Sequence, residues 1–214
     1  MNILNELLIL SESKEKNLIG LTIDGKKITE KTSSEPWFDN FYCNNNQLTS
    51  LKGAPTSVGG YFSCSDNKLT SLKGAPSSVG GYFSCSHNLL TSLEGAPSSV
   101  GDGFSCSDNK LTSLKGAPSS VGGGFSCSDN KLASLKDINK QLKKMNGCFY
   151  ANGNPITSHV IGLLLIPGCK EVRLDNKQVQ DILNRHLEKP FGNRRFLDCQ
   201  SELLDAGLDE LAKL

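Results

Sequence analysis

The sequence lacks an excess of charge of either sign, since 23 lysine and arginine residues balance 22 aspartate and glutamate residues. A balanced chain has no overall electrostatic attraction to nucleic acid or to a membrane surface. The apolar run at 160–166 is far too short to span a bilayer, because a spanning helix needs about 20 residues. The N-terminus has neither a basic leader nor a small-residue cleavage site, so we expect no signal peptide and a cytoplasmic protein.

Cysteine is plentiful, with eight residues, but the patterns typical of metal sites are missing. There is no C-x-x-C pair and no cluster of Cys and His with metal-ligand spacing. Five cysteines recur every 21 residues at an inward strand position, where Cys acts as a small apolar residue. The strand spacing of about 4.8 Å also exceeds the ~3.8 Å that the Cβ atoms of a disulfide prefer. We expect reduced structural thiols, no metal and no cofactor, and we assign no role to Cys148, Cys169 or Cys199.

A repeating unit of 21 residues fills the middle of the chain. Copies begin at Phe41, Phe62, Phe83, Phe104 and Phe125, and a diverged copy begins at Phe149 after a spacing of 24. Self-similarity at this period is typical of a solenoid, in which stacked units share a core that no single unit could form.

Each unit follows the pattern F-x-C-x-x-N-x-L-x-x-L, which is the leucine-rich-repeat core with Phe and Cys in two of the usual leucine positions. Phe62 and Cys64 alternate with polar residues, which predicts a short strand with one buried face. Leu69 and Leu72 then turn inward, and the G-A-P triplet interrupts regular structure. Stacking the units predicts a parallel sheet with a mostly irregular convex side, and ladders of equivalent Phe, Cys, Asn and Leu residues.

The asparagine of each unit follows the strand, where backbone groups would lose their partners. Its amide carries both a donor and an acceptor, so we expect it to bridge neighbouring units and satisfy buried backbone groups. The predicted structural ladder consists of Asn46, Asn67, Asn88, Asn109, Asn130 and Asn154.

Segments without the repeat flank it and should close its ends, because bare ends would expose apolar surface and strand edges. We divide the chain into an N-terminal α/β cap at 1–40, a solenoid of about six units at 41–156 and a mainly helical cap at 157–214.

Within the caps, the pattern predicts several elements. The first cap should contain an amphipathic helix at 1–12, a strand and turn around Asp24-Gly25, and Trp37 and Phe38 covering the first unit. The C-terminal part should contain a helical turn within 136–144, a helix at 157–166, a strand at 170–175, a helix at 176–188 capped by Asp175, and a helical pair at 195–206 and 208–213.

The units resemble bacterial-type leucine-rich repeats, which occur in secreted effectors of enteric pathogens and in many tailed-phage proteins. The loop L-T-S-L-x-G-A-P-x-x-V-G-G with F-x-C-S-x-N, and the tail that begins GLLLIPGCKEVRLDNKQ, are most similar to uncharacterised repeat proteins of large tailed phages. The resemblance covers roughly residues 41–214 and implies a scaffold that binds proteins through surfaces that vary from case to case. It also implies a host protein as the partner, the host-cell cytoplasm as the location, and inhibition or redirection of that protein as the outcome.

The third unit departs from the others and provides the first candidate surface. Its turn carries a histidine, a leucine and a glutamate where neighbouring units carry Asp, Lys and Lys. Tyrosine also occupies an outward strand position that is glycine in later units. We expect these residues to form an interaction hot spot near the middle of a concave face, although drift in a duplicated array is the alternative. The candidates are Tyr61, Tyr82, His87, Leu89 and Asp102.

A basic cluster with interleaved aromatic residues in the C-terminal cap provides the second candidate surface. It contains Arg185, His186, Lys189, Arg194 and Arg195, with Phe191 and Phe196 between them. Such residues can bind nucleic acid or a small nucleotide through phosphate contacts and stacking. Nearby acidic residues dilute the charge, and a protein-docking role for this cap is the alternative.

Catalysis has little support in the sequence. No His or carboxylate recurs beside the strand serines, so they form no nucleophile–base pair. Related effectors carry a large ubiquitin-ligase domain with a catalytic cysteine, but only about sixty residues follow the last repeat here, and Cys199 lies on a predicted amphipathic helix. A small-ligand function would require a pocket between solenoid and cap, and no phosphate-cradling loop supports one. We therefore predict a non-enzymatic protein-interaction module.

Overall fold

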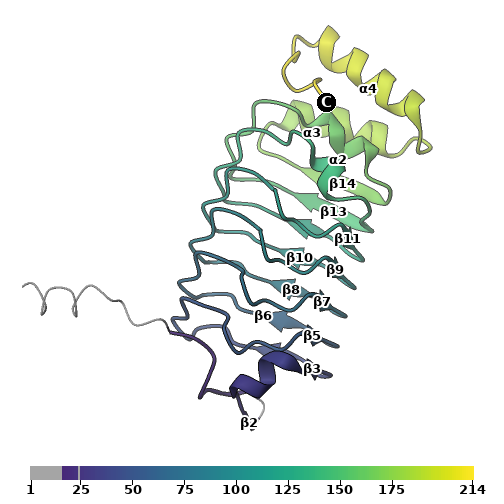
Figure 1. Cartoon of the computed structure of the whole chain (residues 1–214). Helices are drawn as coiled ribbons and strands as arrows, with labels where there is room; N and C mark the ends of the chain where they lie inside the picture. Colours follow the sequence, from purple (N-terminus) through teal and green to yellow (C-terminus); the bar gives the residue numbers. More distant parts are fainter. Residues whose placement is uncertain (1–15, 24) are drawn as a thin grey trace, which may run out of the picture.

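The computed structural model describes residues 16–23 and 25–214, which form a solenoid of stacked parallel strands (Figure 1). The main sheet has seven strands, and each pairs in parallel with the equivalent strand of the next unit. They are β4 (Phe41–Tyr42), β6 (Phe62–Ser63), β8 (Phe83–Ser84), β10 (Phe104–Ser105), β12 (Phe125–Ser126), β13 (Gly147–Tyr150) and β14 (Cys169–Arg173). The predicted leucine-rich-repeat-like solenoid is confirmed, with one strand more than the six repeat copies supply.

Each turn also contributes two residues to a second parallel sheet, which we did not predict from the sequence. Its strands are β3 (Pro36–Trp37), β5 (Ser57–Val58), β7 (Ser78–Val79), β9 (Ser99–Val100) and β11 (Ser120–Val121). The valines point inward and are buried. The glycine after each valine permits close stacking, since a Cβ on Gly101 would lie 1.9 Å from the carbonyl oxygen of Gly80.

Phenylalanine fills the core beneath the main sheet as a continuous stack. Successive rings from Phe41 to Phe149 lie 5.1 to 5.6 Å apart, centroid to centroid, and are nearly parallel. The cysteine ladder lies beside them, and each thiol donates to a carbonyl oxygen of the next unit, as from Cys43 Sγ to Ser63 O at 3.3 Å. Two Leu ladders complete a core in which each unit covers its neighbour.

The asparagine ladder bridges neighbouring units as predicted. Asn109 Oδ1 accepts from the Leu90 backbone N–H at 2.9 Å, and Asn109 Nδ2 donates to the carbonyl oxygens of Cys85 and Cys106, both at 3.1 Å. Asn67, Asn88, Asn130 and Asn154 make the equivalent contacts. The prediction is wrong for the side chain of Asn46, which among the described residues donates to Asn44 within its own unit, while its backbone N–H donates to Asn67 Oδ1.

The N-terminal cap forms a hairpin and a short helix. The predicted strand is confirmed as β1 (Thr22–Ile23), which pairs antiparallel with β2 (Lys26–Lys27) and is followed by the 3-10 helix η1 (Glu30–Ser34). Trp37 is buried and packs edge-on against Phe41, 5.1 Å between ring centroids, so it covers the first unit as predicted. Phe38 was predicted to do the same, but it is 82% exposed, because successive residues of extended chain point to opposite sides and Trp37 points inward. The helix expected at 1–12 and residue 24 lie outside the described residues.

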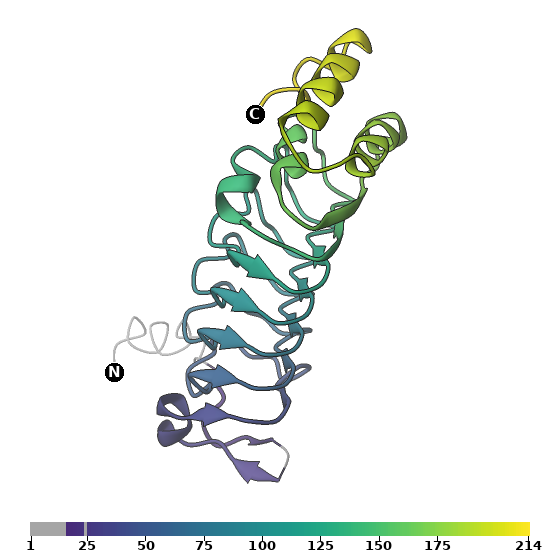
Figure 2. The ribbon, with the colours of Figure 1, turned by 90° about the vertical axis from the view of Figure 1, so that its right-hand side faces the viewer.

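The C-terminal cap adds a strand to the main sheet and places two helices over the last turns (Figure 2). Its elements are the 3-10 helix η2 (Ile161–Leu165), β14, α3 (Lys177–Leu187) and α4 (Asn193–Asp205), and the short helix α2 (Ile138–Gln141) precedes the cap in the unit that begins at Phe125. The predicted helical turn, the strand and the helices at 176–188 and 195–206 are confirmed.

Three details of the predicted C-terminal cap are wrong. The helix expected at 157–166 is limited to η2, and residues 208–213 form turns instead of a helix. The cap of α3 is Asn176, whose side chain accepts from the Val179 backbone N–H at 3.1 Å. Asp175 instead accepts from the Gly153 backbone N–H at 2.9 Å, and so links the last repeat turn to β14.

Candidate functional site

All four tyrosines of the chain lie on the outer face of the main sheet. Tyr42 and Tyr150 occupy outward positions on β4 and β13, while Tyr61 and Tyr82 directly precede β6 and β8. Tyr42, Tyr61 and Tyr150 are 46%, 45% and 40% exposed, and Tyr82 is half-buried. We use the name tyrosine face for these four residues and the strand serines between them.

The floor of the tyrosine face is built from serine hydroxyls. The outward strand residues are Ser63, Ser84, Ser105 and Ser126, with Ser65, Ser86 and Ser107 in the adjacent column. Their hydroxyls pair diagonally between units at 2.7 Å, from Ser65 to Ser84, Ser86 to Ser105 and Ser107 to Ser126. The floor is therefore flat, polar and uncharged, and its hydroxyls are held in fixed positions.

Two tyrosines pack against each other and against the floor. The rings of Tyr61 and Tyr82 meet edge to face, with centroids 6.4 Å apart. Tyr82 extends over the next unit, where a Cβ on Gly103 would lie 2.7 Å from its ring. Burial also raises the pKa of the Tyr82 hydroxyl. Gly81 thus makes room for the Tyr61 ring and Gly103 for the Tyr82 ring.

An acidic and a basic residue lie at the C-terminal end of this face and neutralise each other. Glu171 and Arg173, both on β14, form an ion pair at 2.5 Å. The Cys148 thiol lies 3.4 Å from Glu171 Oε2 and is half-buried, whereas the other seven cysteines are buried. Contact with Cys148 raises the pKa of Tyr150.

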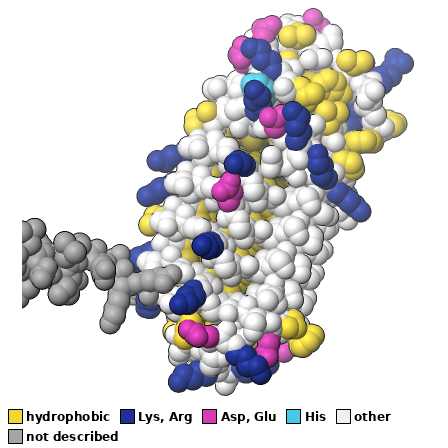
Figure 3. Space-filling view, in the orientation of Figure 1, with side chains coloured by type: hydrophobic (Ala, Val, Ile, Leu, Met, Phe, Trp, Pro, Cys, Tyr) yellow, Lys and Arg dark blue, Asp and Glu magenta, His cyan; other side chains and the backbone are white. Residues whose placement is uncertain are grey.

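His87, Leu89 and Glu94 of the third unit follow β8, whereas Tyr82 precedes it, so they lie at the opposite end of this strand from the tyrosine. Their contacts are with neighbouring repeat units. Equivalent residues of adjacent units stack in columns about 4.8 Å apart, so a repeated charge faces its own copies. His87 separates two aspartates and lies 3.5 Å from Asp108, measured from Nε2 to Oδ2. Leu89 separates two lysines, and Glu94 pairs with Lys115 at 2.9 Å. Figure 3 shows rows of basic side chains along the repeats, one of them interrupted by an acidic side chain.

Asp102, the remaining residue of the first candidate surface, belongs neither to the tyrosine face nor to the turn of the third unit. It is exposed, at the corner between the two sheets and next to Gly103. Its backbone N–H donates to the Gly81 carbonyl at 3.2 Å, so it lies close to the Tyr82 end of the tyrosine face.

Most side chains of the basic cluster in the C-terminal cap form ion pairs or hydrogen bonds within the protein. Arg185 and His186 both bind Glu202, the latter from Nε2 at 2.8 Å, and Lys189 lies 3.6 Å from Asp198. Arg195 is buried, donates from Nε to the Leu164 carbonyl at 3.2 Å and stacks on Phe191.

Arg194 is the one arginine of the cluster that is exposed and forms no ion pair within 16–23 and 25–214. Little positive charge therefore remains for phosphate contacts. Arg185 is exposed but joins α3 to α4 through Glu202, and the buried Arg195 joins α4 to η2.

Two potential nucleophiles, Cys199 and Ser134, lack the surroundings of a catalytic residue. Cys199 is fully buried and burial raises its pKa to about 12, so it is a poor nucleophile at neutral pH. Ser134 Oγ lies 3.1 Å from His159 Nδ1, a pair that the sequence did not reveal because 25 residues separate them. The Ser134 hydroxyl also accepts from the Lys136 backbone N–H at 3.1 Å, as Ser50, Ser71 and Ser92 do in their own turns. No carboxylate among the described residues orients His159, so the pair lacks the third group of a catalytic triad.

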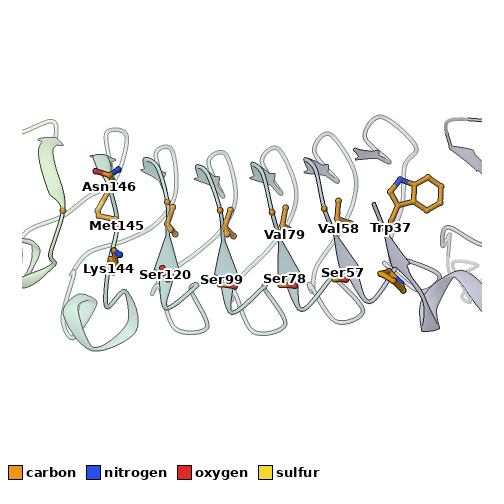
Figure 4. A pocket seen from close by; sticks show the side chains of 18 of the residues that line it. Trp37, Ser57, Val58, Ser78, Val79, Ser99, Ser120, Lys144, Met145 and Asn146 are labelled. Carbon is orange, nitrogen blue, oxygen red and sulfur yellow. The ribbon is translucent and has the colours of Figure 1, made fainter. Parts of the chain in front are cut away.

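A groove follows the outer side of the second sheet, with a volume of about 820 Å³ (Figure 4). Strand serines and the glycines that follow each valine form its floor, with Phe38 at one end and Lys144 at the other. Lys144 is the only charged residue among those that line it.

The fold defines the class of this protein, a leucine-rich-repeat-like solenoid with a helical C-terminal cap. No protein-family model matches the chain, and no curated protein matches its sequence. Within the described part of the chain, no helix has the length and apolar character to cross a membrane, and no three His, Cys, Asp or Glu side chains gather as metal ligands would.

Proposed function

We propose that this solenoid is a non-enzymatic protein-interaction module that binds its partner through the tyrosine face. The observation that carries the proposal is the position of all four tyrosines on one face, over a floor of serine and glycine. Tyrosine offers a large amphipathic contact at low entropic cost, and serine and glycine permit close approach and adaptable hydrogen bonds. Antibody combining sites use the same residue types, and tyrosine is enriched among binding hot spots.

The chemistry of the face defines the partner surface that would fit it. The floor carries no charge, and the charges at its C-terminal end are paired, so a strongly charged partner surface would lose solvation without compensation. A flat surface with apolar and hydrogen-bonding groups is the better match. Following the resemblance to tailed-phage repeat proteins, a host-cell protein is the first partner to test, and inhibition or redirection of that protein in host defence or takeover is the proposed outcome.

Affinity capture with matched variants tests this function. The tagged chain, the double variant Tyr61→Ser/Tyr82→Ser and the control Phe38→Ser would be incubated with host-cell lysate. Phe38→Ser removes an exposed aromatic ring from a different face. We expect one protein to be retained at near-stoichiometric amounts by the wild-type chain and by the control, and to be lost from the double variant.

Two outcomes would contradict the proposal. The first is equal retention by all three proteins, which would place the contact elsewhere. The second is retention of nucleic acid instead of protein, with a strong salt dependence, which would favour the C-terminal cap.

A further inference from the structure

A pocket of about 590 Å³ lies between the N-terminal cap and the loops of the first two units. Ser33 of η1 forms one side, and residues 49–56 of the first unit form the floor. Ser71, Lys73 and Gly74 of the next unit close the other side. This is the kind of pocket between solenoid and cap that a small-ligand function requires, and it lies on a different surface from the tyrosine face.

The charged residues that line this pocket, among those that the structure describes, are two lysines. Lys52 and Lys73 occupy equivalent positions in adjacent units, so their backbones are about 4.8 Å apart. Two like charges in neighbouring rungs repel each other unless an anion lies between them. Further along the same column the chain provides that anion itself, because Glu94 binds Lys115 at 2.9 Å.

Three hydroxyl groups of the pocket can donate to a ligand, whereas that of Ser33 already donates to the Glu30 carbonyl. Ser50 Oγ accepts from the Lys52 backbone N–H and Ser71 Oγ accepts from the Lys73 backbone N–H, both at 3.1 Å. Thr49 Oγ1 accepts from the Lys16 backbone N–H at 2.9 Å. Since each oxygen already accepts a bond, its own hydrogen remains available for an acceptor in the pocket.

We propose that this pocket binds a small organic phosphate monoester. A phosphate group carries between one and two negative charges at neutral pH and three acceptor oxygens, which match two lysines and the donating hydroxyls. The volume is larger than a phosphate group needs, and Ala54 and Pro55 supply an apolar wall for the organic part.

An NMR titration of the full chain with phenyl phosphate tests the proposal. We expect saturable shifts of the backbone amides at 49–56 and 71–74. Lys52→Gln/Lys73→Gln should weaken binding at least tenfold, while Lys115→Gln/Lys136→Gln, a pair from the same column, should leave it unchanged. Benzoate, with the same ring but one charge, should bind at least tenfold more weakly than phenyl phosphate.

Three results would overturn the proposal. These are the absence of saturable shifts at 49–56, equal weakening by the two lysine pairs, and equal affinity for benzoate and phenyl phosphate. Thermal unfolding of both double variants would show that they remain folded, since all four lysines are exposed.

Discussion

The repeat units and the C-terminal cap are held together by different kinds of contact. In the repeats, neighbouring turns are joined by copies of two uncharged contacts, the stacked Phe rings and the Asn bridges. In the cap, each contact occurs once and several are charged, as in the pairing of Arg185 and His186 with Glu202 and the buried Arg195 that binds Leu164. A repeated interface thus favours neutral groups, whereas a unique interface can use ion pairs.

The surface of the repeats follows the same principle. A column of identical apolar rings is stable, but a column of identical charges repels itself, and the third unit interrupts the charged columns with His87, Leu89 and Glu94. Relief of like-charge repulsion therefore explains why His87 and Leu89 replace Asp and Lys at the turn. It does not explain why tyrosine occurs at 61 and 82.

The largest effect should come from the interior of the repeats. Phe104→Ala removes a fully buried ring that stacks on two others, and we expect it to lower the free energy of unfolding by about 3–5 kcal/mol. Phe191→Ala is the control, because Phe191 is 57% exposed. Denaturant unfolding would compare them, and a similar small loss in both would contradict the stacked core.

The Asn bridges should contribute next. Asn109→Ala leaves the backbone groups of two units without partners, and we expect a loss of about 1–3 kcal/mol in the free energy of unfolding. Asn46→Ala breaks one contact within its own unit and should cost clearly less. Equal losses in denaturant unfolding would show that bridging between units is not the source of the effect.

In the cap, Glu202→Gln should have a smaller and local effect. The hydrogen bond from buried His186 lowers the pKa of Glu202, so the ionised carboxylate stabilises the cap above its ordinary pKa. That contribution is lost as the pH falls through the lowered pKa. We expect about 1 kcal/mol at neutral pH after allowance for solvent screening, seen as faster amide exchange in α4 with the repeats unchanged.

Two results would contradict this account of the cap. One is an equal acceleration of amide exchange in the repeats, because the contact would then not be local. The other is a difference in amide exchange of α4 between wild type and variant that persists at acid pH, where protonated Glu202 is uncharged like the glutamine that replaces it.

The smallest effect should come from the charged columns. Glu94→Lys restores a lysine between Lys73 and Lys115 and should lower the melting temperature slightly at low salt. About 1 M salt should abolish the difference, because the charges are exposed. Asp102→Lys makes the same change of two charge units in the same unit, outside the column, and should have a weaker effect. A salt-independent loss would show that like-charge repulsion is not the cause.

The fold could be predicted from the sequence because the repeats are nearly identical. Any residue that recurs every 21 positions must face its own copy, so the Phe, Cys, Asn and Leu ladders could be predicted directly. The Ser-Val sheet was not predicted, because each of its strands has one apolar residue between serine and glycine and so lacks the apolar alternation of Phe62 and Cys64. The cap was predicted less well, since its contacts occur once and depend on tertiary packing, as the choice of Asn176 over Asp175 at α3 shows.

The candidate site could be predicted only in part. Tyr61 and Tyr82 follow from the repeat register, but Tyr42 and Tyr150 join them only when the main sheet is assembled across divergent units. Arg195 looked available in the sequence and is buried in the structure, because its position on α4 faces η2. The pocket beside η1 depends on where the cap folds back on the first loops, which no local pattern specifies.

Radical footprinting of the aromatic side chains in the complex with the captured partner tests the central claim most directly. Oxidation of each tyrosine, and of the exposed Phe38 and Phe191 as internal references, would be measured with and without the partner. Binding through the tyrosine face predicts strong protection of Tyr61 and Tyr82 with Phe38 and Phe191 unchanged. Protection of Phe38 or Phe191 with the tyrosines unchanged would contradict it.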